Sequence, residues 1–137
     1  MNIALQQLVK EFALFDNWED KYLFIIEMGH SLARLDNTKK NDTTRVIGCI
    51  SQVWLIFTKK NNKFYFFADS DSLIVRGLLA IVLKLSSGKT KYEIKNINFI
   101  QIFETLNLKK HLTPTRNNGL LSIINKIHKI VDGLLIA

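Results

Sequence analysis

The 137-residue chain is 47% hydrophobic, which is enough for one domain over residues 1–137 whose core needs no disulfide or metal. Its single cysteine, Cys49, excludes an intramolecular disulfide and argues against a zinc site or an iron–sulfur cluster held by several cysteines. The net charge of +7 raises the question of nucleic acid, but the lysines are dispersed and no aromatic–basic RNA-binding signature accompanies them. We expect no nucleic-acid partner.

The N-terminal stretch MNIALQQLVKEF lacks the basic segment and long apolar core of a secretory signal, so we expect a cytoplasmic protein. The most apolar stretch, residues 73–85, is shorter than the roughly 20 residues that cross a bilayer. It also contains Arg76 and Lys84. We expect a buried helix there and no association with a membrane.

Two helices are predicted at the start of the chain. Apolar residues recur at helical spacing from Leu5 to Phe12 and again from Trp18 to Leu32. Asn17 is a suitable N-cap for the second helix, with Asp20 three residues later in a capping-box-like position. The polar stretch 36–44 predicts a loop.

A β-hairpin is predicted next. The runs QVWLIFT (52–58) and KFYFFA (63–68) are rich in β-branched and aromatic residues. Asn61-Asn62 can form the turn between them, because asparagine tolerates the left-handed conformation. A short strand at 45–47 would place Cys49 at the tip of a strand-to-strand turn.

Residues 69–72, DSDS, offer several N-cap oxygens to an apolar helix at 73–86, and Gly88 is a suitable stop for that helix. We expect this helix to lie against the sheet. Gly77 within it costs about 1 kcal/mol relative to alanine, so we expect a close packing contact there.

The last third of the chain predicts only helices. One or two short helices are expected over 91–106, and apolar residues from Leu120 to Leu134 mark a terminal amphipathic helix. No linker or repeat divides the chain. The predicted fold class is α+β, with helices packed around a small antiparallel sheet.

Two interpretations of Cys49 follow from its neighbours. A free cysteine is most often a small buried hydrophobe. Here Gly48, Ser51 and Gln52 interrupt any apolar stripe and indicate a turn, which favours a displayed thiol.

Four separated stretches resemble the SufE family, the sulfur acceptors of cysteine desulfurases in iron–sulfur cluster assembly. They occur in the family's order and spacing: WEDKY (18–22), RVIGCISQVW (45–54), ADSDSLIVRGLLA (68–80) and HLTPTRNNGL (111–120). The SQVW and PTR segments are more similar to SufE than to the related CsdE branch, which is the alternative. Ile50 departs from the family, which commonly has a polar residue there, and the tail DGLLIA extends past the family's usual end.

The resemblance implies a fold like that of the scaffold protein IscU, with Cys49 as the site that receives persulfide sulfur. It also implies a SufS-like cysteine desulfurase as the partner and a SufBCD-like scaffold as the recipient. The chain itself would need no cofactor or metal, because the pyridoxal phosphate belongs to the desulfurase. A homodimer is left open.

Several residues could support Cys49. Arg116 matches the family's TPTR-like motif, where it would stabilise an anion or dock the partner; the alternative is a solvated arginine at a helix end. Asp71 is expected to cap the helix that begins at 73 and thereby hold the cysteine loop. Arg45 and Gln52 are weaker candidates, and His111 is expected to pack at the surface rather than act as a base.

Two other classes of function remain as alternatives. One is a stand-alone thiol enzyme, such as a hydrolase or peroxidase, although no Cys-His-Asn or Cys-His-Asp arrangement is recognisable. The other is a basic binding module in which Cys49 is an inert core residue.

Overall fold

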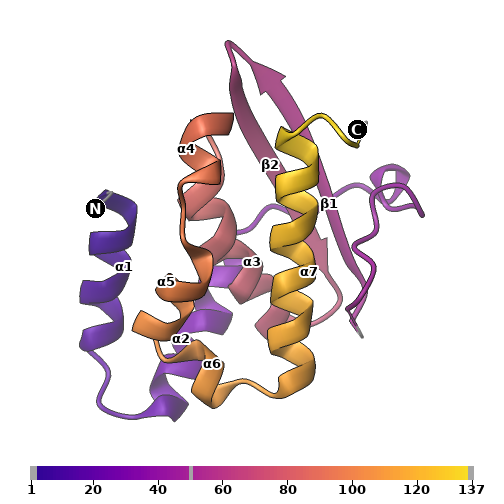
Figure 1. Ribbon diagram of the computed structural model, residues 1–137. Helices are drawn as coiled ribbons and strands as arrows, with labels where there is room; N and C mark the ends of the chain where they lie inside the picture. The colour runs from indigo at the N-terminus through magenta and orange to yellow at the C-terminus, as the bar shows by residue number, and fades with distance from the viewer. Residues whose placement is uncertain (1–2, 50, 136–137) are drawn as a thin grey trace.

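A computed structural model describes residues 3–49 and 51–135 of the chain, so Ile50 and the last two residues of the tail lie outside the described part (Figure 1). The predicted α+β class is confirmed. The sheet has strands β1 Val53–Lys60, β2 Lys63–Ser70 and β3 Lys89–Thr90 in the order β1-β2-β3, all antiparallel. The helices are α1 Ile3–Ala13, α2 Trp18–His30, α3 Leu73–Ser86, α4 Lys91–Lys95, α5 Phe99–Thr105, α6 Leu108–His111 and α7 Pro114–Val131, with a 3₁₀ turn at Asn37–Lys39.

The β-hairpin forms as predicted. Strands β1 and β2 pair along their whole length, from Val53 opposite Ser70 to Lys60 opposite Lys63. Asn61 and Asn62 both have positive φ, 54° and 64°, as a two-residue turn of this hand requires. Strand β3 was not predicted, because two residues carry no periodic pattern.

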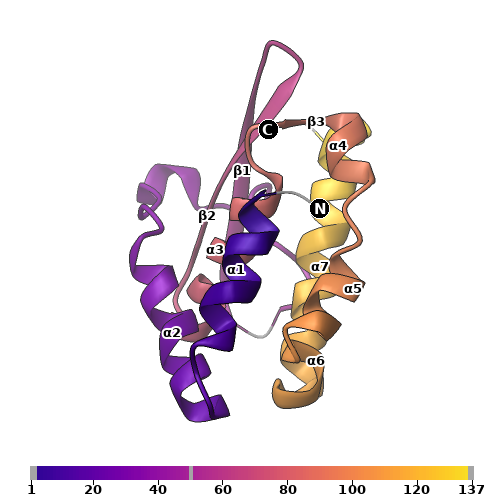
Figure 2. The ribbon, with the colours of Figure 1, turned by 90° about the vertical axis from the view of Figure 1, so that its left-hand side faces the viewer.

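The helices cover one face of the sheet (Figures 1 and 2). Helix α3 packs on β2 and runs against α2, where glycines let the two backbones meet. A Cβ at Gly77 would lie 2.1 Å from the carbonyl oxygen of Ile25, and one at Gly29 would lie 2.7 Å from the amide nitrogen of Gly77. The close contact expected at Gly77 is confirmed.

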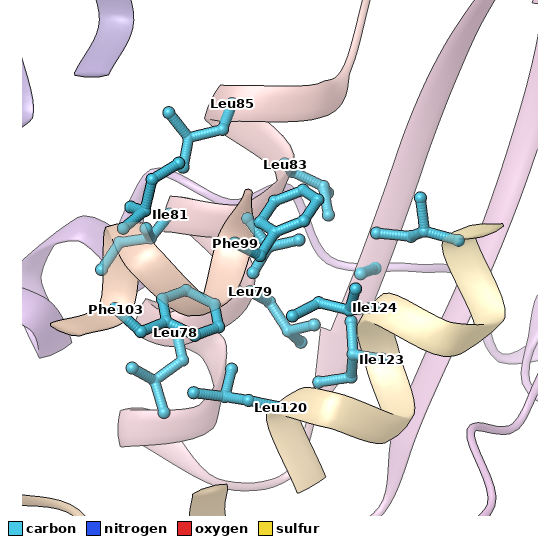
Figure 3. Packing of buried hydrophobic residues seen from close by; sticks show 14 of the residues in the cluster. Leu78, Leu79, Ile81, Leu83, Leu85, Phe99, Phe103, Leu120, Ile123 and Ile124 are labelled. Carbon is cyan, nitrogen blue, oxygen red and sulfur yellow. The ribbon is translucent and has the colours of Figure 1, made fainter. Parts of the chain in front are cut away.

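The core is centred on α3, α5 and α7. Figure 3 shows leucine and isoleucine side chains of α3 meeting aromatic rings of α5 and aliphatic side chains of α7. The labelled residues are buried: Leu78, Leu79, Ile81, Leu83, Leu85, Phe99, Phe103, Leu120, Ile123 and Ile124. This packing fixes α7 in front of the sheet, where its first turns reach the cysteine loop.

Helix α7 differs from its prediction at both ends. It begins at Pro114, where proline lacks only an N–H that has no partner in the first turn anyway. It ends at Val131, and Leu134 is 69% exposed beyond it rather than part of the apolar stripe. Gly133, with φ of 76°, terminates the helix in the left-handed conformation.

A buried ion pair joins the end of β2 to α3. Asp69 is fully buried and accepts hydrogen bonds from the Arg76 guanidinium, from Lys40 Nζ and from the backbone N–H groups of Leu35 and Ser70. Arg76 also donates to the carbonyl oxygens that end α2. Asp69 is therefore a structural anchor, although the sequence placed it only among the possible caps.

No helix within residues 3–49 and 51–135 is long and apolar enough to cross a membrane.

Candidate functional site

The loop that carries Cys49 is a short turn closed by backbone contacts. Arg45 forms an isolated bridge with Trp54, and the N–H of Val46 donates to Val53 O at 2.8 Å, so the predicted strand at 45–47 is reduced to one bridge. Gly48 has φ of 100°, which favours glycine. Cys49 thus lies in a strand-to-strand turn, as its neighbours predicted.

The loop is packed against the first turns of α7. A Cβ at Gly48 would lie 2.4 Å from the Oγ atom of Ser122, so only glycine fits that approach. On the same helix, the Cys49 thiol donates a long hydrogen bond to the carbonyl oxygen of Gly119, with 3.6 Å between sulfur and oxygen. The thiol is half-buried, between the two interpretations that the sequence allowed.

A small cavity adjoins the sulfur. Its volume is about 50 Å³, larger than the roughly 10–15 Å³ that one water-sized sphere occupies, so one further sulfur atom fits beside Cys49. The walls are mostly apolar and come from the cysteine loop, α3 and α7: Cys49, Ser51, Val75, Leu78, Thr115, Arg116, Gly119, Leu120 and Ile123.

The electrostatic environment keeps the thiol protonated. Burial raises the pKa of Cys49 above its ordinary value, and the nearby positive charge of Arg45 lowers it by a smaller amount. Because the thiolate is the nucleophile, the loop as folded holds the sulfur in its unreactive form.

Arg116 shares the cavity with Cys49. It lies in the first turn of α7, where its backbone N–H donates to the Oγ atom of Thr113, the N-cap residue. Its side chain is partly buried and lines the cavity, so the structure brings together the two residues that the sequence placed 67 positions apart. A guanidinium there can face an anion that forms on the sulfur.

Asp71 and Gln52 form a direct bridge under the cysteine loop. The Asp71 carboxylate accepts from the Gln52 N–H at 3.0 Å, and the Asp71 N–H donates to the Gln52 carbonyl oxygen at 3.3 Å. The expected capping role was wrong: Ser72 is the N-cap of α3 and accepts from the N–H of Val75. Asp71 is turned toward the loop instead, so its carboxylate satisfies a loop donor rather than a helix donor.

His111 lies apart from the cavity lining. Its ring stacks on Trp18, with the ring centroids 4.3 Å apart and the planes 13° apart. The expected packing role is confirmed. Over residues 3–49 and 51–135, no three histidine, cysteine or acidic side chains gather in a way that could hold a metal ion.

Sequence reasoning missed Gly119 and Ser122, the residues of α7 on which the loop rests. The predicted helix began at Leu120, one residue after Gly119, so this glycine did not indicate a close approach. It lies within the observed helix α7, where glycine is unfavourable unless another group comes close. Nothing in the sequence showed that the approaching group is the sulfur of Cys49.

Comparisons with known proteins identify the family of the chain. A family model described as SufE, Fe-S metabolism associated domain, matches residues 6–131. An uncharacterized SufE-like protein of Rhizobium meliloti is 39% identical, over 96% of this chain and 97% of its own length. Another from Rhizobium etli is 39% identical, over 92% of this chain and 88% of its own.

A solved structure has the same fold. The solution structure of a hypothetical protein from Thermus thermophilus matches with a TM-score of 0.77 at 14% identity, covering 96% of this chain and 95% of that one. At that identity the likeness concerns the fold alone. On the family model and the two close relatives, the chain belongs to the SufE family of iron–sulfur metabolism.

Proposed function

We propose that the protein is a sulfur acceptor, in which Cys49 receives persulfide sulfur from a SufS-like cysteine desulfurase and passes it to a SufBCD-like cluster scaffold. The observation that carries this proposal is the cavity beside the Cys49 sulfur. It has room for one more sulfur atom, is walled by apolar side chains and has Arg116 at its lining. An inert core cysteine needs no such space.

The transfer is an exchange at sulfur. The Cys49 sulfur attacks the terminal sulfur of the donor persulfide, the sulfur–sulfur bond of the donor breaks, and the donor cysteine leaves as a thiolate. The proton of the Cys49 thiol passes to that leaving thiolate. Cys49 then carries the added sulfur as a persulfide anion, and no oxidant or reductant is consumed.

The folded loop supports a role in protection. Burial keeps the pKa of Cys49 raised, so the free protein presents little thiolate to solvent. To react, the sulfur must leave Gly119 and lose its desolvated environment, or a partner must supply a charge that stabilises the thiolate. Contact with the desulfurase can bring about either change, and this would direct the thiol toward its donor rather than toward other electrophiles.

The direct test is mass spectrometry. The chain is incubated with a cysteine desulfurase, its pyridoxal phosphate and L-cysteine, and analysed without reductant. The wild-type chain should gain one sulfur atom at residue 49, whereas Cys49→Ser should gain none. An unmodified wild-type chain, under conditions in which the desulfurase itself carries persulfide, would refute the proposal. Turnover of any thiol-enzyme substrate without added desulfurase would favour the stand-alone enzyme instead.

A further inference from the structure

A second, larger cavity lies beside the loop that leads to Cys49. Its volume is about 370 Å³, and its lining comes from this loop, from α7 and from the residues after α7. Three cationic side chains line it, Arg45, Lys126 and Lys129, against one carboxylate, Asp42. We call this cavity the basic groove.

Among the described residues, the cations of the basic groove have no acidic ion-pair partner. Across residues 3–49 and 51–135, the ion pairs involve Asp69, Asp132 and Glu27, and none involves Arg45, Lys126 or Lys129. The fully buried Asp69, by contrast, is paired with the cationic side chains of Arg76 and Lys40. The groove therefore presents positive charge that is free to meet an anion from outside.

Lys126 is held in place for such an anion. Its Nζ atom donates to the carbonyl oxygens of Thr43 and Arg45 at 3.2 Å and 3.0 Å, which uses two of the three hydrogens of the ammonium group. The third hydrogen has no acceptor among the described residues. Burial lowers the pKa of Lys126, which is the effect of a charge that lacks a compensating partner.

Exposed apolar side chains also line the groove. Ile47 is 79% exposed and Leu135 is 36% exposed. Cationic and exposed apolar side chains together fit a protein segment better than a nucleic acid, because no aromatic side chain that could stack a base lines the groove. Ile47 stands two residues before Cys49, so a segment seated here touches the same loop that carries the sulfur.

We propose that the basic groove is a docking site for an acidic, carboxylate-bearing segment of the cysteine desulfurase, which sits on Lys126, Lys129 and Arg45 and brings the donor sulfur to the adjacent loop. The inference rests on the proposed function. A carboxylate supplies the third acceptor for Lys126 and neutralises the cluster, and the contact places the partner beside the loop that carries Cys49.

The test pairs affinity with a chemical map of the contact. Lys126→Gln with Lys129→Gln removes two positive charges and keeps a hydrogen-bond donor at 126, and Lys60→Glu at the exposed hairpin end, which changes the net charge by the same two units, is the matched control. Calorimetric titration with the desulfurase at low and moderate salt should show affinity weakened roughly tenfold by the double change, with a flatter salt dependence, and little effect of the control. Sulfur addition to Cys49 at saturating desulfurase should remain.

Zero-length carbodiimide coupling of the wild-type complex should join Lys126 or Lys129 to an aspartate or glutamate of the desulfurase, and peptide mass spectrometry should locate the link. Affinity of the double variant equal to that of the control, or links only at other lysines, would overturn the groove while leaving sulfur transfer intact. Tight, groove-dependent binding of a 20-nucleotide single strand at physiological salt would assign the groove to nucleic acid instead. A wild-type chain that binds the desulfurase but gains no sulfur contradicts the proposed function alone, and one that does not bind it contradicts both.

Discussion

The sulfur of Cys49 lies 3.6 Å from the carbonyl oxygen of Gly119, on a helix that begins 65 residues further along the chain. A methyl group at position 119 would lie 3.4 Å from the same sulfur, in ordinary van der Waals contact. The loop therefore rests on a surface with room for one added carbon atom at position 119. This contact connects the packing of α7 with the reactivity of the thiol.

Enlarging residue 119 should release the thiol. Gly119→Val places two further methyl groups where the sulfur lies, so we expect the cysteine loop to move outward and iodoacetamide to alkylate Cys49 several-fold faster than in the wild type. Gly119→Ala is the matched control, because its single methyl group fits and its helix propensity is better. Thermal melting confirms that both variants fold. Equal alkylation rates in all three proteins would show that the contact does not restrain the loop.

Removing the Asp71 carboxylate should loosen the loop from its other end. In Asp71→Ala the Gln52 N–H loses its acceptor, which costs about 1 kcal/mol of unfolding free energy and should speed alkylation of Cys49. Ser72→Ala is the control, because it costs a similar amount through the N-cap of α3 without touching Gln52. Urea unfolding measures the loss of stability in each variant, and the alkylation rate measures how far the cysteine loop opens. Faster alkylation in both variants would mean that general destabilisation opens the loop.

The buried carboxylate of Asp69 should dominate acid stability. Burial raises its pKa, but hydrogen bonds from Lys40, Ser70 and Leu35 outweigh that effect and hold the pKa below its ordinary value. A carboxyl whose folded pKa is depressed stabilises the fold above its unfolded pKa, and that contribution disappears as the pH falls through the folded pKa. Asp69→Asn leaves the Arg76 charge without its counterion and should cost about 3 kcal/mol at neutral pH.

Urea unfolding across acid and neutral pH checks this prediction. The wild type should lose stability as the pH falls below about 4, the ordinary aspartate range, and Asp69→Asn should lose less over the same interval. Asp132→Asn is the control, because Asp132 pairs with Lys91 and Lys95 at the surface and its loss should change stability little. An Asp69→Asn curve parallel to that of the wild type would contradict the prediction.

Local patterns predicted the elements of the fold well, because their signals are short in sequence. The hairpin turn at Asn61-Asn62, the cap at Asn17 and the close approach at Gly77 each depend on one residue type in one local setting. Strand β3 and the early start of α7 carried no comparable signal. Two residues cannot show a period, and TPTRNN is polar although it opens a helix.

The site was only half predictable for the same reason. Cys49, Arg116 and Gln52 were found through motifs, and the structure brings the first two to one cavity. The partner of each loop contact depends on tertiary packing. Asp71 could have faced α3 or the loop from the same sequence, and only the fold shows that it binds Gln52 while Ser72 caps the helix.

Arg116 should matter for sulfur transfer more than for folding. Its side chain lines the thiol cavity, while its backbone N–H makes the cap bond to Thr113 whichever side chain is present. Arg116→Ala should therefore leave the melting temperature nearly unchanged and reduce stimulation of the desulfurase. Lys59 and Lys63 at the hairpin end are the comparison, because their loss should have little effect. If stimulation were lost in the lysine variants and retained in Arg116→Ala, the desulfurase would dock at the hairpin end and not around Arg116.

The reactivity of Cys49 should depend on pH in a way that reports its burial. Because burial raises the pKa of the thiol, the alkylation rate of the free protein should rise through an inflection above the range of an ordinary cysteine. The positive charge of Arg45 lowers that pKa, so Arg45→Gln should move the inflection still higher, while Lys60→Gln should not move it. In urea all three proteins should share the ordinary inflection.

A raised folded pKa also means that the stability linked to the neutral thiol is complete below the unfolded pKa and is lost as the pH rises through the folded one. Cys49→Ser should remove that alkaline loss, and an inflection at the ordinary value in the folded wild type would show that the sulfur is already free of Gly119.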